Sequence, residues 1–329
     1  LWAELLGVER VGRHDNFFEL GGHSLAAIRL LDRLRKAGLQ AALNDVFQQP
    51  SVALLAARLD DNTRQAGGAV TVRTGTAGTP LFLVHEFTGL DFYFPVLGQQ
   101  LGGEFAIYGL PGVPAEQPQP RTLECLARYH IGQMRQVQPH GPYRLAGWSF
   151  GGIVAFEIAN QLLGADESVE FVGLIDTYAP RLADQGKARW AGQYALERQL
   201  LLNCSAFWGT QGPAAAGKVA HLQQLEAVQA DFATLLATCR TQGLLYGLWA
   251  SMSDAQLLHY FSRELAHGYA LAHYRPAPLH IPVHLFRAEQ GPDPLPTLGW
   301  GEALPGQRLQ TLTVPGAHRR PRTSLPLGR

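Results

Sequence analysis

Cysteine is scarce in this sequence, and its three residues, Cys125, Cys204 and Cys239, lie far apart without a C-x-x-C pair. We therefore expect no disulfide framework and no metal site, and a reducing cytoplasmic location fits. An excess of charge of either sign is also missing, because 27 Lys and Arg balance 27 Asp and Glu. Without a net positive field or a basic run with interleaved aromatics, nothing favours a nucleic-acid or membrane partner.

Long apolar runs are absent too. No stretch of about 18 apolar residues could span a bilayer, and no signal peptide opens the chain. The chain has 329 residues, of which 46% are apolar. This length and composition suit one large domain with its own core and a second, smaller domain. The chain begins in mid-pattern with LWAELLG and no initiating methionine, so we expect it to be a piece of a longer protein.

Residues 1–60 are predicted to form a small bundle of helices. One helix starts in residues 1–6, a second carries Leu25, Ile28, Leu31 and Leu34 at helical spacing, and PSVALLAARL at 50–59 predicts a third. Residues 61–79 are rich in Gly, Thr and Ala without helical period. We interpret them as a linker that runs into a first edge strand.

Residues 80–329 alternate between short apolar runs and helical patterns. Strands are predicted at 81–87, 105–110, 143–149, 169–176, 279–290 and 307–316, and helices at 121–138 and 150–164. This alternation predicts a mostly parallel sheet with helices on both faces. Residues from about 183 to 273 are helical and apolar-rich without a strand signal, which predicts a helical insertion.

GWSFGG, at 147–152, surrounds a single serine with glycines. Its first five residues fit G-x-S-x-G between a predicted strand and a predicted helix, a context that a chance match would lack. Such a turn raises the Ser149 hydroxyl above the sheet edge and aims the Phe150 N–H at an incoming carbonyl oxygen, beside the positive helix end. We predict that Ser149 is a nucleophile and that Phe150 supplies one backbone donor of an oxyanion hole.

A serine hydroxyl needs a base, and in this arrangement an acid and then a histidine follow later in the chain. Asp176 ends the next predicted strand, in GLIDTYAP, and His318 follows the last one, in VPGAH. We predict that these two complete a triad with Ser149. Asp176 could instead start a turn, and Glu289 or Asp293 could be the acid, since both follow the HIPVHLF run.

HEFTG, at 85–89, follows the LFLV strand, where the second oxyanion donor arises in such folds. We assign that donor to the N–H of Phe87, and a lone His85 at a strand end indicates a structural role. His280 and His284 alternate on a predicted strand and are interpreted as packing residues.

GPYRLAGWSFGGIVAFEIANQLLG, with LIDTYAP downstream, resembles the thioesterase domains that end nonribosomal peptide synthetases and polyketide synthases. The resemblance is close over about 80–180 and loose over 279–318. It implies an α/β-hydrolase fold, an acyl chain carried on Ser149, an Asp176 that orients His318, and a lid formed by the insertion at 183–273. The chain departs from the family in two places: the family usually has His-Pro-x-Gly-Gly where HEFTG stands, and a closing helix where only eleven residues follow His318.

Two apolar runs in the predicted lid, LLNCSAFWG and GLLYGLWA, have two interpretations. They could line a channel for apolar or aromatic groups, or they could be the core of the lid itself. We favour the core.

DNFFELGGHSLAAIRLL, at 15–31, resembles the 4′-phosphopantetheine attachment motif of peptidyl carrier proteins. The resemblance covers about 1–60 and implies a small all-α carrier with 4′-phosphopantetheine bound covalently to Ser24. The residues agree, because Ser24 is placed to cap a helix, Gly21 and Gly22 allow a sharp turn, and a phosphodiester would lie at the positive helix end. Ser24 could be only a cap, an interpretation that the intact string disfavours.

The two resemblances together imply the terminal release module of a nonribosomal peptide synthetase. His318 would take the proton of Ser149, which attacks the thioester on the Ser24 arm, and hydrolysis or cyclisation would then release the product. The implied partners are upstream synthetase domains in the same longer chain, a phosphopantetheinyl transferase and the thioester substrate. The alternatives are a carrier fused to an inactive hydrolase-fold docking domain, a hydrolase that edits misloaded carriers, and an esterase for diffusible esters.

Overall fold

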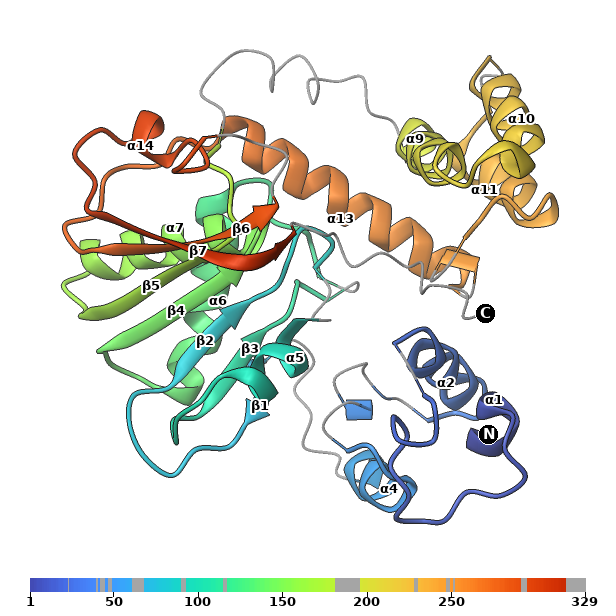
Figure 1. Ribbon diagram of the computed structural model, residues 1–329, viewed down its shortest axis with the longest axis horizontal. Helices are drawn as coiled ribbons and strands as arrows, with labels where there is room; N and C mark the ends of the chain where they lie inside the picture. The colour runs from blue at the N-terminus through green and yellow to red at the C-terminus, as the bar shows by residue number, and fades with distance from the viewer. Residues whose placement is uncertain are drawn as a thin grey trace.

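A twisted sheet of seven strands lies at the centre of the larger part of the chain (Figure 1), in the order β1-β3-β2-β4-β5-β6-β7. The strands are β1 Val70–Arg73, β2 Leu81–Val84, β3 Ile107–Leu110, β4 Tyr143–Trp148, β5 Val169–Ile175, β6 Val283–Gln290 and β7 Leu309–Ala317. β1 pairs with β3 antiparallel, and the other neighbours are parallel. The carboxyl ends of the parallel strands therefore share one edge of the sheet.

The structure is a computed structural model, and it describes residues 1–22, 24–39, 41, 45–46, 49–60, 68–89, 93–114, 117–180, 196–227, 230–246, 249–250, 252–290 and 295–317. No helix in these ranges combines the length and apolar character that crossing a bilayer requires.

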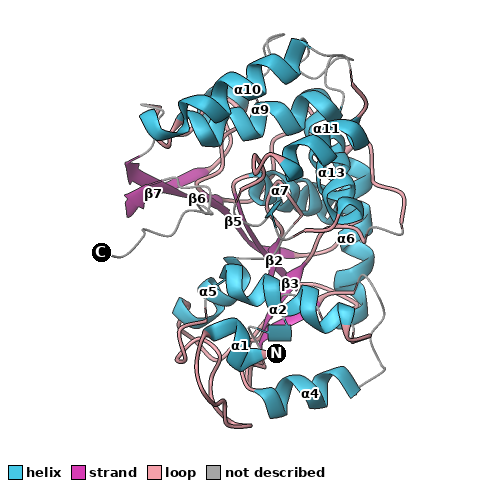
Figure 2. Cartoon of the chain, turned by 90° about the vertical axis from the view of Figure 1, so that its right-hand side faces the viewer, coloured by secondary structure: helices cyan, strands magenta, loops and turns pink. Residues whose placement is uncertain are grey.

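Helices cover both faces of the sheet, as Figure 2 shows, with α5 (Tyr93–Gln100) on one side and α6 (Leu123–Val137) and α7 (Phe150–Gly164) on the other. Strand β2 is buried on both faces because its side chains alternate between two cores. Phe82 and Val84 pack with α6 and α7, whereas Leu81 and Leu83 pack with α5. The predicted mostly parallel sheet with helices on both faces is confirmed.

The strands predicted at 81–87 and 279–290 extend furthest beyond the observed bounds. The strand expected at 81–87 ends at Val84, because the chain turns back at once and Gly89 N–H donates to Glu86 O at 2.9 Å. His280 lies before β6 and is exposed, so it is not a packing residue of that strand. Pro282 stands between them and has no N–H for a ladder. His284 does lie on β6, where its ring stacks on Phe171 with 4.9 Å between centroids.

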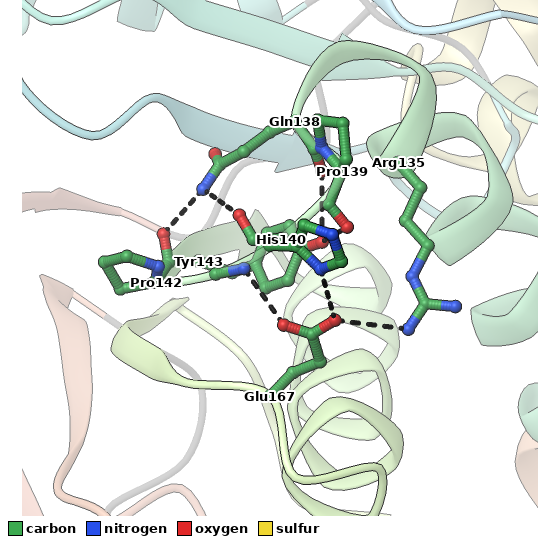
Figure 3. Close-up of polar contacts among 8 residues, drawn as sticks. Arg135, Gln138, Pro139, His140, Pro142, Tyr143 and Glu167 are labelled. Carbon is green, nitrogen blue, oxygen red and sulfur yellow. Dashed lines mark hydrogen bonds and ion pairs between the residues drawn. The ribbon is translucent and has the colours of Figure 1, made fainter.

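The turn that leads into β4 is held by a polar cluster around Glu167 (Figure 3). The Glu167 carboxylate accepts the N–H of Gly141 at 3.0 Å and pairs with Arg135 and His140 at 3.5 Å each. This cluster lies at the start of β4, the opposite end of the strand from Ser149. It therefore fixes where β4 begins and has no part in the site described below.

The helical insertion between β5 and β6 has its own core. Its elements are α9 Leu196–Gly209, η1 Pro213–Ala215, α10 Ala216–Ala227, α11 Phe232–Thr241 and α13 Asp254–His273. Leu201, Cys204, Leu245 and Trp249 are buried within it, which confirms that the two apolar runs form the core of the insertion. Helix α13 joins both cores, because Phe261 packs in the insertion and Ala270 packs against the sheet. A short helix, α14 (Trp300–Ala303), precedes β7.

The N-terminal residues form a separate small helical core. Its helices are α1 Trp2–Leu6, α2 Ser24–Lys36 and α4 Val52–Asp60, drawn in blue in Figure 1. Trp2 and Phe17 meet edge to face at 4.9 Å, and Leu30, Leu34 and Leu55 are buried with them. A core of this size is marginal, as expected for about sixty residues.

Candidate active site

Ser149 stands between β4 and α7 with backbone angles of φ 54° and ψ −119°. A non-glycine residue rarely adopts a positive φ, so the surrounding structure must hold this turn in place. The Ser149 N–H donates to Ile175 O at 2.9 Å, which ties the turn to β5. A Cβ on Gly151 would overlap the carbonyl oxygens of Val84 and His85. The glycines are therefore required because strand and helix backbones pass very close to each other here.

Asp176 lies beside Ser149 on the same sheet edge. Trp148 pairs with Ile175, so Ser149 and Asp176 are the first residues beyond paired strand ends. Asp176 also has a positive φ of 45° and is buried, and its carboxylate accepts the N–H of Ala288 at 3.0 Å. A buried carboxylate held in this way has a fixed orientation, which suits a residue that orients a histidine.

The structure describes only one of the other residues considered for the triad. Glu289 is exposed near the end of β6, whereas Asp293 and His318 lie outside the described residues. Strand β7 ends at Ala317, which pairs with Gln290 of β6. In the sequence, His318 directly follows β7, which lies two places from β5 in the sheet order. Its role as the base of the triad stays a prediction.

The segment HEFTG forms a tight turn after β2. Gly89 N–H donates to Glu86 O at 2.9 Å, and Thr88 N–H donates to the Glu86 carboxylate at 3.0 Å. The ring of Phe87 meets that of Phe150 edge to face at 5.4 Å. The two residues whose N–H groups are the predicted oxyanion donors therefore lie next to each other.

Three buried histidines pack behind this turn. The rings of His85 and His130 are 5.2 Å apart, those of His85 and His267 are 5.3 Å apart, and His267 stacks on Phe150 at 4.7 Å. Burial, reinforced by the neighbouring imidazoles, lowers the pKa of His85 and His267 well below the ordinary value and that of His130 to about 3. All three are therefore neutral at pH 7. Within the described ranges, no three His, Cys, Asp or Glu side chains are arranged to hold a metal ion.

Sequence reasoning missed His267 and Arg263, which lie on α13 and contact the turn at 86–89. His267 Nδ1 donates to Phe87 O at 2.7 Å, and Arg263 donates to Thr88 O at 3.1 Å. The only available signal is their i, i+4 spacing, which places both on one face of a helix. That spacing does not tell which surface the face contacts.

Ser24 is the first residue of α2, instead of the cap residue before it. Gly21 has a φ of 93°, a conformation that favours glycine, and a Cβ on Gly22 would overlap Phe17. The chain therefore turns sharply just before the helix. A phosphate on Ser24 would lie at the N-terminal end of α2, where the first backbone N–H groups have no partner within the helix. The local backbone thus fits the phosphodiester that a carrier serine bears.

Comparison with known proteins identifies both parts of the chain. The sequence profile of the thioesterase domain matches residues 79–323. The chain belongs to the thioesterase domain family. A second profile, that of the phosphopantetheine attachment site, matches residues 1–59. The predicted combination of a carrier domain with a thioesterase domain is therefore confirmed, and the carrier domain implies a covalent 4′-phosphopantetheine on a serine.

Nonribosomal peptide synthetases are among the proteins to which this chain is similar. The chain is 40% identical over 183 residues to a dimodular nonribosomal peptide synthase of Bacillus subtilis (strain 168), covering 54% of this chain and 8% of that protein. It is 35% identical over 187 residues to enterobactin synthase component F of Escherichia coli (strain K12), covering 54% of this chain and 14% of that protein. The structure of AB3403, a four-domain nonribosomal peptide synthetase in its holo form bound to AMP and glycine, matches with a TM-score of 0.61 and 29% identity, covering 96% of this chain and 24% of that chain. The chain therefore spans a small part of the length of these proteins.

The buried histidines predict that the thioesterase domain loses stability in mild acid. The unfolded chain takes up protons near pH 6.5, whereas the folded imidazoles stay neutral, so stability is full above that pH and falls as the pH drops below it. Each histidine contributes at most about 1.4 kcal/mol per pH unit. Arg263 and the adjacent imidazoles oppose a positive charge there, and the Glu86 carboxylate is already bound to Thr88.

Urea unfolding between pH 7.5 and 5.5 measures this slope. His130→Phe removes one titrating group and should make the acid slope shallower by about 1 kcal/mol per pH unit. His280→Gln, at an exposed position, is the matched control. Equal slopes in the wild type and His130→Phe would contradict the prediction.

Proposed function

We propose that this chain releases an acyl or peptidyl group from its own carrier domain. The thioester is transferred to Ser149 and then released by hydrolysis or by intramolecular cyclisation. The observation that carries the proposal is the strained turn at Ser149 beside the buried, oriented Asp176, in a chain that also contains a carrier domain. Backbone strain of this kind persists at functional sites because it holds a reactive group in position.

In the first stage, Ser149 Oγ attacks the carbonyl carbon of the thioester and passes its proton to the imidazole of His318. The carbonyl oxygen becomes negative and accepts hydrogen bonds from the N–H groups of Phe87 and Phe150, with the N-terminus of α7 adding partial positive charge. The carbon–sulfur bond then breaks, and the sulfur leaves with the proton from His318. An ester on Ser149 remains.

In the second stage, His318 removes a proton from water or from a nucleophile within the acyl chain. That oxygen or nitrogen attacks the ester carbonyl, the same N–H groups stabilise the charge, and Ser149 regains its proton from His318. Asp176 keeps the imidazole oriented and stabilises its charged form.

Ser24 is the proposed attachment residue. When bound, 4′-phosphopantetheine supplies a thiol that carries the acyl group as a thioester. A linker of about 20 residues keeps the effective concentration of the two domains high, so a weak domain interface suffices. Upstream synthetase domains would supply the acyl group, and a phosphopantetheinyl transferase would modify Ser24.

A fluorophosphonate probe tests whether the site is an active serine hydrolase. We expect stoichiometric labelling of the folded protein, located by peptide mass spectrometry at Ser149, because the probe reacts with an activated serine. Heat-denatured protein is the control and should not react. An unlabelled folded protein that also leaves a loaded thioester intact would instead indicate an inactive docking domain.

A further inference from the structure

Three consecutive carbonyl groups of the HEFTG turn are held by buried side chains. His85 Nδ1 donates to Glu86 O at 2.7 Å. His267 Nδ1 donates to Phe87 O at 2.7 Å, and Arg263 donates to Thr88 O at 3.1 Å. A carbonyl oxygen only accepts, so both imidazoles carry their proton on Nδ1. Two of the three donors come from α13, about 175 residues further along the chain.

The donors to Glu86 O determine the direction of the proposed oxyanion donor. The C=O of Glu86 and the N–H of Phe87 belong to the same peptide group and point in opposite directions across its plane. Glu86 O accepts from His85 at 2.7 Å and from Gly89 N–H at 2.9 Å. Holding that oxygen on one side therefore aims the Phe87 N–H to the other.

The next peptide group, between Phe87 and Thr88, is held by His267 of α13, which donates to Phe87 O. His267 stacks on His85 at an interplanar angle of 19° and on Phe150 at 23°. His267 thus packs against His85, which orients the Phe87 N–H, and against Phe150, which supplies the other proposed oxyanion donor. A shift of His267 would move both sides of the oxyanion hole.

Arg263 connects the turn to a second loop. Its guanidinium donates to Thr88 O at 3.1 Å and to Val113 O at 2.8 Å, and a Cβ on Gly89 would overlap it. A planar guanidinium can bridge two carbonyls in a fixed geometry, which an ammonium group does poorly. Gly112 N–H completes the connection by donating to Gly89 O at 3.1 Å.

We propose that His267 and Arg263 are positioning residues that hold the 86–89 turn so that the Phe87 N–H faces the developing oxyanion. Glu86 does not restrict the backbone angle φ as a proline ring would, so the side chains packed against the turn add to the hydrogen bonds within it in keeping it rigid. The proposal rests on the proposed thioesterase function of Ser149. It makes α13, a helix of the insertion, part of the support of the catalytic machinery.

Paired variants test the role of His267 on a diffusible thioester, for which kcat and KM can be measured separately. His267→Leu removes the donor, and we expect kcat to fall about 10- to 100-fold with KM within about twofold, because the loss is of transition-state stabilisation. His267→Asn places an amide N–H near the position of Nδ1 and should recover most of the activity. Arg263→Lys should lie between the wild type and Arg263→Met, since one ammonium cannot bridge both carbonyls well. His273→Leu, an exposed change on the same helix, is the matched control.

An alkyl boronic acid separates positioning from folding. It forms a tetrahedral adduct with Ser149 whose oxygen occupies the oxyanion hole, so its inhibition constant should rise by the same factor as kcat falls. A variant that merely unfolds in part loses active protein but keeps the inhibition constant, and that result would overturn the proposal. Wild-type kcat in His267→Leu would also overturn it. If the wild type neither turned over the thioester nor bound the boronate, the proposed function itself would fail.

Discussion

Ser149→Ala should stop release and leave the carrier loaded, with a loss in kcat of at least about 10⁴-fold. The loss is large because the acyl-enzyme route needs an oxygen at this position, and neither Asp176 nor the oxyanion donors can replace it. The measurement is intact-protein mass spectrometry of the loaded chain over time, with product followed in parallel. Wild-type turnover by Ser149→Ala would remove Ser149 from the mechanism.

Ser149→Gly is the matched companion of this variant. Both changes remove the hydroxyl, but glycine adopts a φ of 54° without the strain that a Cβ brings. We therefore expect Ser149→Gly to be as inactive as Ser149→Ala. Its free energy of unfolding should be higher by an amount on the order of 1 kcal/mol, and its melting temperature should be higher accordingly. Equal melting temperatures for the two variants would contradict the idea that the turn is held under strain for catalysis.

The elements around Ser149 were predictable because local chemistry determines them. The strand at 143–148 and the helix at 150–164 follow from a buried apolar run, a glycine-edged turn and a helical apolar pattern that all agree. The end of β2 was harder, since 81–87 looks uniformly apolar apart from His85 and Glu86. The turn that ends it depends on a carboxylate bound to Thr88, which no periodicity reveals.

The support of the oxyanion turn could not be predicted. His85, His130 and His267 come from three distant parts of the sequence, and each one alone is read most simply as a packing residue. Only the fold brings them together, because α13 leaves the core of the insertion and reaches the sheet. HEFTG is one of the two places where the sequence departs from the family that it resembles. In the structure, His267 and Arg263 of α13 donate hydrogen bonds to carbonyl groups of this segment.

Ser24→Ala should abolish the mass increase that the wild-type chain gains on incubation with coenzyme A and a phosphopantetheinyl transferase. The carrier domain has two serines, so Ser51→Ala is a matched control that removes the other hydroxyl. Ser51 Oγ accepts the N–H of Leu54 at the start of α4, so this control costs about 1 kcal/mol of stability and should still be modified. An equal mass gain in Ser24→Ala and the wild type would exclude Ser24 as the attachment site.

The same Ser24→Ala variant separates the two halves of the proposed function. It cannot be loaded, so release of a carrier-bound acyl group falls to background. Its thioesterase domain is unchanged, so a diffusible thioester of the same acyl group, which gains nothing from tethering in either protein, should be turned over at the wild-type kcat. Ser149→Ala should show the reverse pattern, loading normally and failing on both substrates. Loss of diffusible-thioester turnover in Ser24→Ala would mean that Ser24 contributes to the hydrolase site itself, and the division of labour between carrier and thioesterase would then be wrong.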